Sequence, residues 1–402
     1  MSFDFDKAKV FVAGIASLVL SVGIARFAYT PMLPIMQTQA GLSQSAGAWL
    51  ASINYIGYFL GVVLTASIHD IRLKDTCYRL GMVIAVLSTM LMASTSNIWL
   101  WGLLRFFAGI SSSAGILMSS GLVLNWLINN NKASKLGWHF SGIGLGIMLA
   151  AIVATFVHQS IDWREMWLVY GITCALLLYP ALMWLPKPTR QHSHKTTKEA
   201  LGKTPSPLFL RMLRLGYFCA GVGFVVNATF IVAIVNHTLG NDSQGYLIFI
   251  LLGAAAAPSP IIWDKISHRM GHLNALLLAC LIQTMGILLV AFDSSLTTLL
   301  ISAILFGNTF IAIVNIVMTM SGQYYPKNPA KMMAKVALSY SFAQVVAPIA
   351  VAVMASHGLG YTQGLYLAGI VMVIGTLCVF CLKQLEQNKG NIEVRTQQVE
   401  NL

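Results

Sequence analysis

The chain has 402 residues, of which 57% are hydrophobic and only 9% are charged, and its mean hydropathy is +0.73. Soluble domains carry about 25% charged residues because their surfaces face water. A chain this poor in charge cannot cover a water-soluble globule, so most of its surface must face lipid. The composition therefore excludes a soluble enzyme or a soluble binding module, and the net charge of +12 needs another explanation.

Long apolar runs recur along the chain. Each crossing of the hydrocarbon layer takes about 20 apolar residues, whereas barrel strands alternate over about ten. Continuous runs of this length therefore predict helices. The twelve runs cover residues 9–39 (broken at Pro31 and Pro34), 44–68, 77–96, 98–127, 137–159, 163–185, 208–236, 244–263, 271–292, 296–325, 333–356 and 361–382.

One polar stretch, rich in Pro, Thr, Lys and His, divides these runs into six and six. Such a composition is typical of a flexible linker. The expected fold class is all-α integral membrane, with twelve transmembrane helices in two six-helix bundles. The expected domains are an N-terminal bundle (1–185), a cytoplasmic linker (186–207), a C-terminal bundle (208–383) and a cytoplasmic tail (384–402).

Lysine and arginine set the orientation, because short cytoplasmic loops are enriched in both. With the N-terminus inside, the outer loops hold only Arg164, and Arg26 and Arg105 lie within helices. All other basic residues then fall on the inner side. The sequence thus predicts a multi-pass protein of the inner membrane with both termini in the cytoplasm. The positive charge is therefore explained by membrane topology and by contact with anionic lipid, and not by binding of nucleic acid.

Arg26 and Arg105 are the charged residues that lipid should exclude. A charge at the bilayer centre costs about 2.5–3.5 kcal/mol even on lenient insertion scales. The acidic residues all fall in loops, tails or helix ends, so neither arginine has a buried carboxylate nearby in sequence. Two uncompensated cations predict a positive cavity that an anionic substrate group neutralises. The alternative is that helix carbonyls or neighbouring polar side chains satisfy both arginines.

Several polar side chains recur at helical spacing within the apolar runs. Small residues in these stripes allow close helix packing, which is the simpler interpretation for the glycines. Hydrogen-bonding groups that lipid cannot satisfy favour a cavity lining instead. The candidates for substrate or coupling contacts are Asn54, Tyr58, Asn227, Asn315 and Gln344, together with His139, whose imidazole could relay protons near neutral pH.

Cysteines do not suggest metal chemistry. Cys378 and Cys381 have the spacing of a metal or redox pair, but they lie on an apolar helix without histidine or acidic neighbours. Core packing is the better interpretation. We expect no metal site and no cofactor.

Short motifs resemble the major facilitator superfamily. Asp264-Lys265-Ile-Ser-His-Arg269 follows the predicted eighth helix and is similar to the superfamily's loop signature, of which Asp70 belongs to a degenerate first copy. Arg105-Phe-Phe-Ala-Gly109 is similar to its Arg-x-x-x-Gly motif. The resemblance implies that Asp70, Asp264, Lys265 and Arg269 belong to cytoplasmic gating loops, whose carboxylate caps a helix. It also implies that the two bundles are pseudo-symmetric, and that Arg105 is associated with proton coupling.

A closer resemblance is to the YbfB/YjiJ branch of the superfamily. Gly23-Ile-Ala-Arg26-Phe-Ala-Tyr-Thr-Pro31-Met-Leu-Pro34 resembles the opening signature of that branch, and Ala343-Gln344-Val-Val-Ala-Pro348 resembles a later one. Ala343 and Ala347 stand where glycines are expected. The similarity spans nearly the whole chain and implies a fold and a transport role but no particular cargo.

The function predicted is secondary active transport of a small organic solute, for which an anion is one candidate class, by alternating access with proton coupling. The chain lacks the P-loop pattern G-x-x-x-x-G-K-[ST], so ATP is not its direct driver. Drug or metabolite efflux by antiport, and a non-transporting membrane sensor, remain alternatives. An intramembrane enzyme needs a gathered nucleophile and base or metal ligands, which the scattered histidines do not supply. Expected partners are the substrate, protons and lipid, with a functional monomer.

Overall fold

A computed structural model describes residues 5–130, 136–188, 205–240, 242–293, 295–324 and 329–400. Within these ranges the chain is helical and contains no strand. Among the described residues, eleven helices are long and apolar enough to cross a membrane, and a pair of helices bent by 44° makes a twelfth crossing if the pair counts as one span. The fold class predicted from the sequence is therefore confirmed.

The first six crossings form what we call the N-terminal half. Its helices are α1 (Phe5–Leu18), the π-helical segment η1 (Val19–Ile24), α2 (Tyr29–Gln39), α3 (Gln44–Ser67), α4 (Ile71–Leu91), the short 3-10 turn η2 (Met92–Ser94), α5 (Ile98–Ser113), the π-helical segment η3 (Ala114–Met118), α6 (Ser119–Asn129), α7 (Gly137–Val157) and α8 (Trp163–Met183).

The last six crossings form the C-terminal half. Its helices are α9 (Pro207–Leu239), α10 (Asp242–Ala256), α11 (Ser259–Met270), α12 (His272–Phe292), α13 (Leu296–Tyr324), α14 (Pro329–Ser356) and α15 (Tyr361–Glu400). Most of the predicted linker lies outside the described residues. The segment expected to be a tail continues α15 as helix to Glu400.

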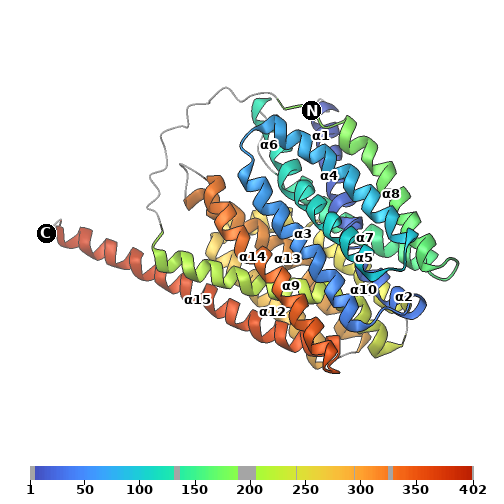
Figure 1. The fold of residues 1–402 in the computed structure, drawn as a ribbon. Coiled ribbons are helices and arrows are strands. Elements are labelled where there is room, and N and C mark those ends of the chain that lie inside the picture. Colours follow the sequence, from blue (N-terminus) through green and yellow to red (C-terminus); the bar gives the residue numbers. More distant parts are fainter. Residues whose placement is uncertain are drawn as a thin grey trace.

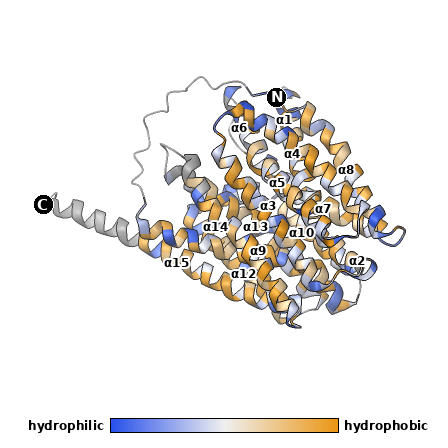
Figure 2. Ribbon diagram, viewed as in Figure 1, coloured by the Kyte–Doolittle hydropathy of each residue, from blue (hydrophilic) through white to orange (hydrophobic). Residues whose placement is uncertain are grey.

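Lipid as the surrounding medium explains the outer surface. Large apolar side chains point outward, with Phe156 and Phe292 each 78% exposed and Leu176 72% exposed. Hydrophobic residues run along the helices, whereas hydrophilic residues gather at helix ends and connections (Figure 2). Soluble monomers rarely expose so much apolar surface to water.

Local sequence sets the helix ends. Asp162 begins α8 with a capping box, in which its side chain accepts from the Glu165 N–H and Glu165 accepts from the Asp162 N–H. Ser206 caps α9, and Pro207 occupies the first turn, where its missing N–H costs nothing. Gly240 ends α9 with φ of 63°, a left-handed conformation that glycine adopts without a steric penalty.

Glycines allow a close helix contact in the N-terminal half. α3 and α5 pack along their length, and a Cβ at Gly109 would collide with the Asn54 carbonyl, while one at Gly57 would collide with the Phe106 carbonyl. Gly109 closes the Arg-x-x-x-Gly motif. The glycine therefore holds the helix that carries Arg105 against α3.

The two halves meet more closely at one end than at the other. We call the end where α8 finishes and α9 begins the linker end, and the end where α2 passes into α3 the far end. α3 and α14 contact each other, and their ribbons converge toward the far end and diverge toward the linker end (Figure 1). The halves also meet where α7 packs on α10, and a Cβ at Gly144 would collide with the backbone of Ala257, the residue that follows α10.

Hydrogen bonds join the halves at the far end. The Tyr361 hydroxyl donates to the Gln44 carbonyl (2.8 Å) and accepts from the Gln37 amide (3.0 Å). Ser45 donates to the Ala352 carbonyl (3.1 Å). Deeper in the bundle, Thr30 donates to the Ala228 carbonyl (2.9 Å). These contacts close the far end in the state that the structure represents.

Candidate functional site

The site begins at a break in the first transmembrane helix. The ring of Pro31 clashes with the carbonyl four residues earlier and cannot donate to it. The helix accordingly gives way at residues 25–28, between η1 and α2, and the Thr30 N–H bonds the Phe27 carbonyl instead of the Arg26 carbonyl. The sequence predicted the break at Pro31 and Pro34 themselves. It lies just before them, because a proline disturbs the turn that precedes it.

Arg105 occupies this break from the neighbouring helix α5. Its Nη1 donates to the Ala25 carbonyl (3.0 Å) and its Nη2 to the Arg26 carbonyl (3.3 Å). The guanidinium lies 4.4 Å from the ring centroid of Tyr29. Arg105 thus satisfies two carbonyls that the broken helix leaves free. Of the two alternatives for this residue, the contacts favour bonding to helix carbonyls.

Arg26 is placed differently. It is 4% exposed, and its Nη2 donates to the side-chain oxygen of Gln344 on α14 (2.5 Å). Its guanidinium lies 4.5 Å from the ring centroid of Tyr55 and 4.6 Å from that of Tyr58. It forms no ion pair with any carboxylate in the described part of the chain. Its Nε is buried and lacks a hydrogen-bond partner. A buried cation with a donor to spare therefore lies where the two halves meet.

Stacked aromatic rings from the C-terminal half lie beside this cation. Tyr217 stacks on Tyr340 (centroids 4.5 Å apart), Tyr340 on Phe224 (5.8 Å), Phe224 on Phe310 (5.2 Å), and Phe310 on Phe306 (5.5 Å). We call these five residues, contributed by α9, α13 and α14, the aromatic ladder.

The ladder connects to Arg26 through Phe27. The ring of Phe27 contacts Phe224 edge to face at 6.2 Å, and the Arg26 guanidinium lies 5.4 Å from the Phe27 centroid. The arrangement offers one positive charge next to an apolar wall with aromatic faces.

The structure brings several of the predicted residues together. Tyr58 and Gln344 contact Arg26 directly. The Asn54 amide donates to the Arg105 carbonyl (2.8 Å), and its oxygen is buried without a partner. The Asn227 oxygen is likewise buried without a partner, one residue before the carbonyl that bonds Thr30. These predicted residues on α3, α5, α9, α14 and the broken helix therefore belong to one central region.

Other predicted residues lie apart from it. His139 is fully buried inside the N-terminal half, where its Nε2 is 2.9 Å from the Ser120 hydroxyl and its ring fills the space over Gly14. Asn315 on α13 donates to the Asp264 carboxylate (3.1 Å). Neither His139 nor Asn315 contacts Arg26.

Some of the predicted gating residues lie in a helix instead of the expected loop. Asp264, Lys265 and Arg269 were expected in a loop, but they lie within helix α11, which continues to Met270. The expectation of a loop is wrong because low hydropathy marks where a helix leaves lipid and not where it ends. Asp70 caps α4 by accepting from the Arg72 N–H, and α4 begins at Ile71 instead of residue 77.

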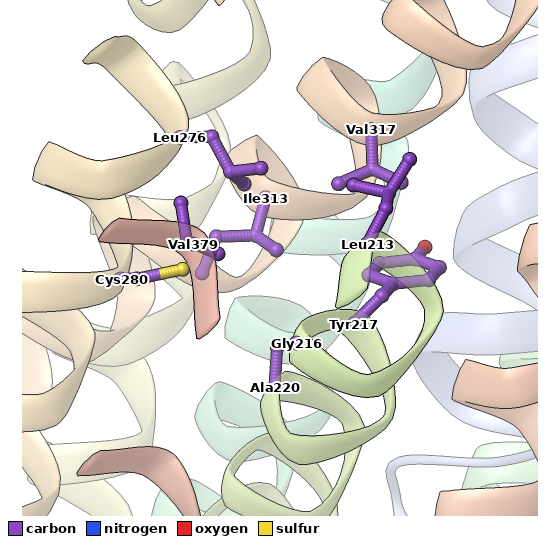
Figure 3. Close-up of a pocket in the computed structure, with 9 residues that line it drawn as sticks. All are labelled: Leu213, Gly216, Tyr217, Ala220, Leu276, Cys280, Ile313, Val317 and Val379. Atoms are coloured by element: carbon purple, nitrogen blue, oxygen red, sulfur yellow. The ribbon is translucent and has the colours of Figure 1, made fainter. Parts of the chain in front are cut away.

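Two hollows lie outside the contacts of Arg26, and one of them adjoins the aromatic ladder at Tyr217. Figure 3 shows an apolar recess within the C-terminal half, lined on one side by Tyr217 and on the other by Cys280 and Val379. It contains no charged group. A cavity of about 390 Å³ lies at the linker end of the N-terminal half, with His69, Asp70, Lys74 and Asn125 among its lining residues.

Sequence reasoning missed the aromatic part of the site. Tyr55 precedes Tyr58 by three residues on α3, and Tyr217 and Phe224 are seven apart on α9, so in each case one helix face carries both rings. These spacings were available signals. Aromatic residues are common in apolar helices, however, and only the fold brings α9, α13 and α14 to one wall.

Comparisons with known proteins agree with this fold. The family model described as "Uncharacterised MFS-type transporter YbfB" matches residues 18–380. The uncharacterised MFS-type transporter YwfA of Bacillus subtilis is 22% identical over 97% of this chain and 93% of its own length. The gentisate transporter of Corynebacterium glutamicum is 23% identical over 92% of this chain and 86% of its own length.

Among solved structures, a point mutant of the nucleoside transporter NupG superposes with a TM-score of 0.70 at 10% identity, covering 93% of this chain and 99% of its own. That likeness shows that the two proteins share a fold. The family model is that of a major facilitator superfamily transporter, and it identifies the chain as a multi-pass membrane protein. The match to the family model is specific, and the chain belongs to the YbfB family of that superfamily.

Proposed function

We propose that the protein is a secondary active transporter that moves a small organic anion across the inner membrane by alternating access, coupled to protons. One observation carries the proposal: Arg26 is buried, forms no ion pair in the described chain, and bonds across the junction between the halves. A charged residue buried in a membrane helix without a counter-charge is costly. A substrate anion would supply the missing charge.

Alternating access is supported by the unequal ends of the molecule. Hydrogen bonds close the far end, whereas α3 and α14 diverge at the linker end. Rocking of the two halves about the central region would exchange these ends. Breaking the Arg26–Gln344 bond is part of that motion. With both termini in the cytoplasm, as the basic residues favour, this arrangement would correspond to an inward-facing state, and we propose that the functional unit is a monomer.

Proton coupling in the proposal follows from electrostatics. A membrane potential of about 100 mV, negative inside, opposes entry of a single anion by about 2.3 kcal/mol. Taking up one proton with each anion removes that opposition. The described contacts of Arg26 include no carboxylate and no imidazole, so we assign the proton no fixed carrier residue. We keep Asp70, Asp264, Lys265 and Arg269 as proposed gating residues of the linker end.

Relatives support small-solute transport without fixing the cargo. The gentisate transporter named above moves a carboxylate, whereas the similarity to NupG extends to fold alone. An organic anion is therefore the class that both the relative and Arg26 favour. Export in exchange for protons would use the same site and differ only in direction.

Proteoliposomes test the proposal. Purified protein is reconstituted and assayed for counterflow of radiolabelled gentisate, benzoate, lactate, succinate and uridine, with and without a pH gradient. We expect saturable counterflow of at least one anion, stimulation by an inward proton gradient, and loss of flux in a folded Arg26→Gln variant. Binding without flux of any solute would identify a sensor. Flux that is unchanged by Arg26→Gln would contradict the assigned site.

A further inference from the structure

Resting on the proposed function, the geometry points to a planar aromatic monocarboxylate as the substrate. We propose that its carboxylate takes the place of the Gln344 amide oxygen at Arg26 and that its ring lies against Phe27 and the aromatic ladder. Three features of the central region carry this inference: the partly unused edge of Arg26, the engagement of both terminal nitrogens of Arg105 by backbone carbonyls, and the aromatic wall beside Arg26.

The free edge of Arg26 fits a carboxylate. The N–H of Nε and one N–H of Nη2 point the same way from the guanidinium plane, and together they match the two oxygens of a carboxylate. In the structure, Nη2 donates to Gln344 while the buried Nε has no partner. An amide oxygen satisfies only half of this edge. A carboxylate satisfies both donors and neutralises the charge, so it has a physical reason to displace Gln344.

The two buried arginines differ in the donors that they can offer to a ligand. Both terminal nitrogens of Arg105 donate to backbone carbonyls of the broken helix, so only its buried Nε lacks a partner. Arg26 instead holds a side chain with its Nη2 and has a free Nε beside it, so it is the arginine at which a carboxylate can bind through two donors. One carboxylate would use this edge fully, whereas a second carboxylate on the same ligand would find no free terminal nitrogen on Arg105. A neutral solute would leave Arg26 uncompensated.

The wall beside Arg26 is aromatic along its length. The rings of the aromatic ladder stack at interplanar angles between 19° and 27°, and Phe27 joins the ladder to the guanidinium. Flat rings offer offset or edge-to-face contacts to another ring, which strengthen binding by about two- to tenfold beyond the effect of burying apolar area. A planar aromatic ligand uses this wall better than a saturated ring of the same charge.

A matched ligand series tests each feature separately. Benzoate, 4-hydroxybenzoate and cinnamate carry one carboxylate and an aromatic ring; cyclohexanecarboxylate lacks the aromatic face, benzamide lacks the charge, and phthalate carries a second charge. Binding to the full-length protein in lipid nanodiscs is measured by calorimetry. We expect at least one aromatic monocarboxylate to bind, cyclohexanecarboxylate to bind about two- to tenfold more weakly than benzoate, and benzamide and phthalate not to compete.

Variants tie the binding to the named residues. Arg26→Gln is expected to weaken benzoate binding at least about tenfold, and Phe224→Leu to remove the preference for benzoate over cyclohexanecarboxylate. Gln344→Ala is expected to strengthen binding, because it removes the acceptor that competes for Arg26. Arg214→Gln and Phe156→Leu make the same chemical changes at exposed positions and are the matched controls.

The outcomes separate this inference from the proposed function. Binding that depends on Arg26 but is never accompanied by counterflow supports the ligand class and overturns transport. Counterflow of a sugar, amine or saturated acid in preference to every aromatic monocarboxylate supports transport and overturns the ligand class. The inference is also overturned when none of the three aromatic acids binds, or when Gln344→Ala weakens their binding as much as Arg26→Gln does.

Discussion

Arg26 and Arg105 are both buried. We predict that replacing Arg105 with methionine destabilises the protein, whereas replacing Arg26 with methionine leaves its stability near that of the parent protein. The substitution keeps the unbranched stem and removes the charge and the donors. Arg105→Met leaves the Ala25 and Arg26 carbonyls without their donor, and the backbone at the break cannot turn them elsewhere. Arg26→Met frees only the Gln344 side chain, which can rotate toward another partner.

The magnitude follows from what each change leaves behind. Neither variant buries the cation any longer, and this gain in stability is common to both. It therefore cancels when their free energies of unfolding are compared. An unsatisfied buried polar group costs about 1–3 kcal/mol, so two fixed carbonyls cost about 2–6 kcal/mol that Arg26→Met does not. Arg26→Met also loses contact with Tyr55 and Tyr58, but about 2.5–3.5 kcal/mol of desolvation is recovered. Its stability should therefore stay near that of the parent protein.

Equilibrium unfolding in mixed micelles measures the difference, with counterflow as the second readout. Arg105→Met should be the less stable by at least about 2 kcal/mol, and Arg26→Met should be folded and inactive. Arg105→Lys should recover part of the loss, because one ammonium can reach one carbonyl but lacks the guanidinium fork. Equal destabilisation by the two methionine variants would refute the division into a structural and a substrate-binding arginine.

Three further changes probe the fold around the site. Gly109→Leu should abolish the folded monomer in size-exclusion chromatography, because α3 backbone fills the space at its Cβ, while Gly121→Leu, which faces open space, should not. Tyr361→Phe removes the hydroxyl that bridges the halves, so amide exchange in the α2–α3 connection should rise; unchanged exchange would show that this bond does not hold the far end closed. Asn315→Asp puts a second carboxylate beside Asp264, and two like charges at this distance repel each other. Its loss of stability should shrink as the pH falls, because protonation removes the repulsion; a deficit independent of pH would count against the contact.

The crossings could be predicted from sequence because lipid imposes one simple requirement on every helix that spans it. The ends of the helices were harder to predict. The polar residues 264–269 suggested a loop, whereas α11 continues through them, since a helix can extend past the membrane surface. The break near Arg26 was placed a few residues late, because the sequence shows the prolines but not the carbonyls that they release.

Part of the central region could be predicted from sequence, because lipid cannot satisfy polar groups in a transmembrane helix. Arg26, Tyr58 and Gln344 stood out as polar groups in apolar helices, and the structure joins them. Arg105 stood out equally, but its carbonyl partners arise only once α5 packs against the broken helix. The aromatic ladder could not be found, because Tyr217, Phe310 and Tyr340 come from distant segments and each is ordinary in its own helix.

The central claim is that the two halves rock about the region of Arg26. Spin labels at Gln44 and Leu359 report on the far end, and labels at Ser67 and Lys335 report on the linker end; all four side chains are exposed. Pulsed dipolar spectroscopy in nanodiscs, with and without a transported anion, measures both distances. The account predicts two populations. In each, the distance between the labels is short at one end and long at the other, and the anion changes the proportions of the two populations. A single unchanging distance at both ends would contradict it.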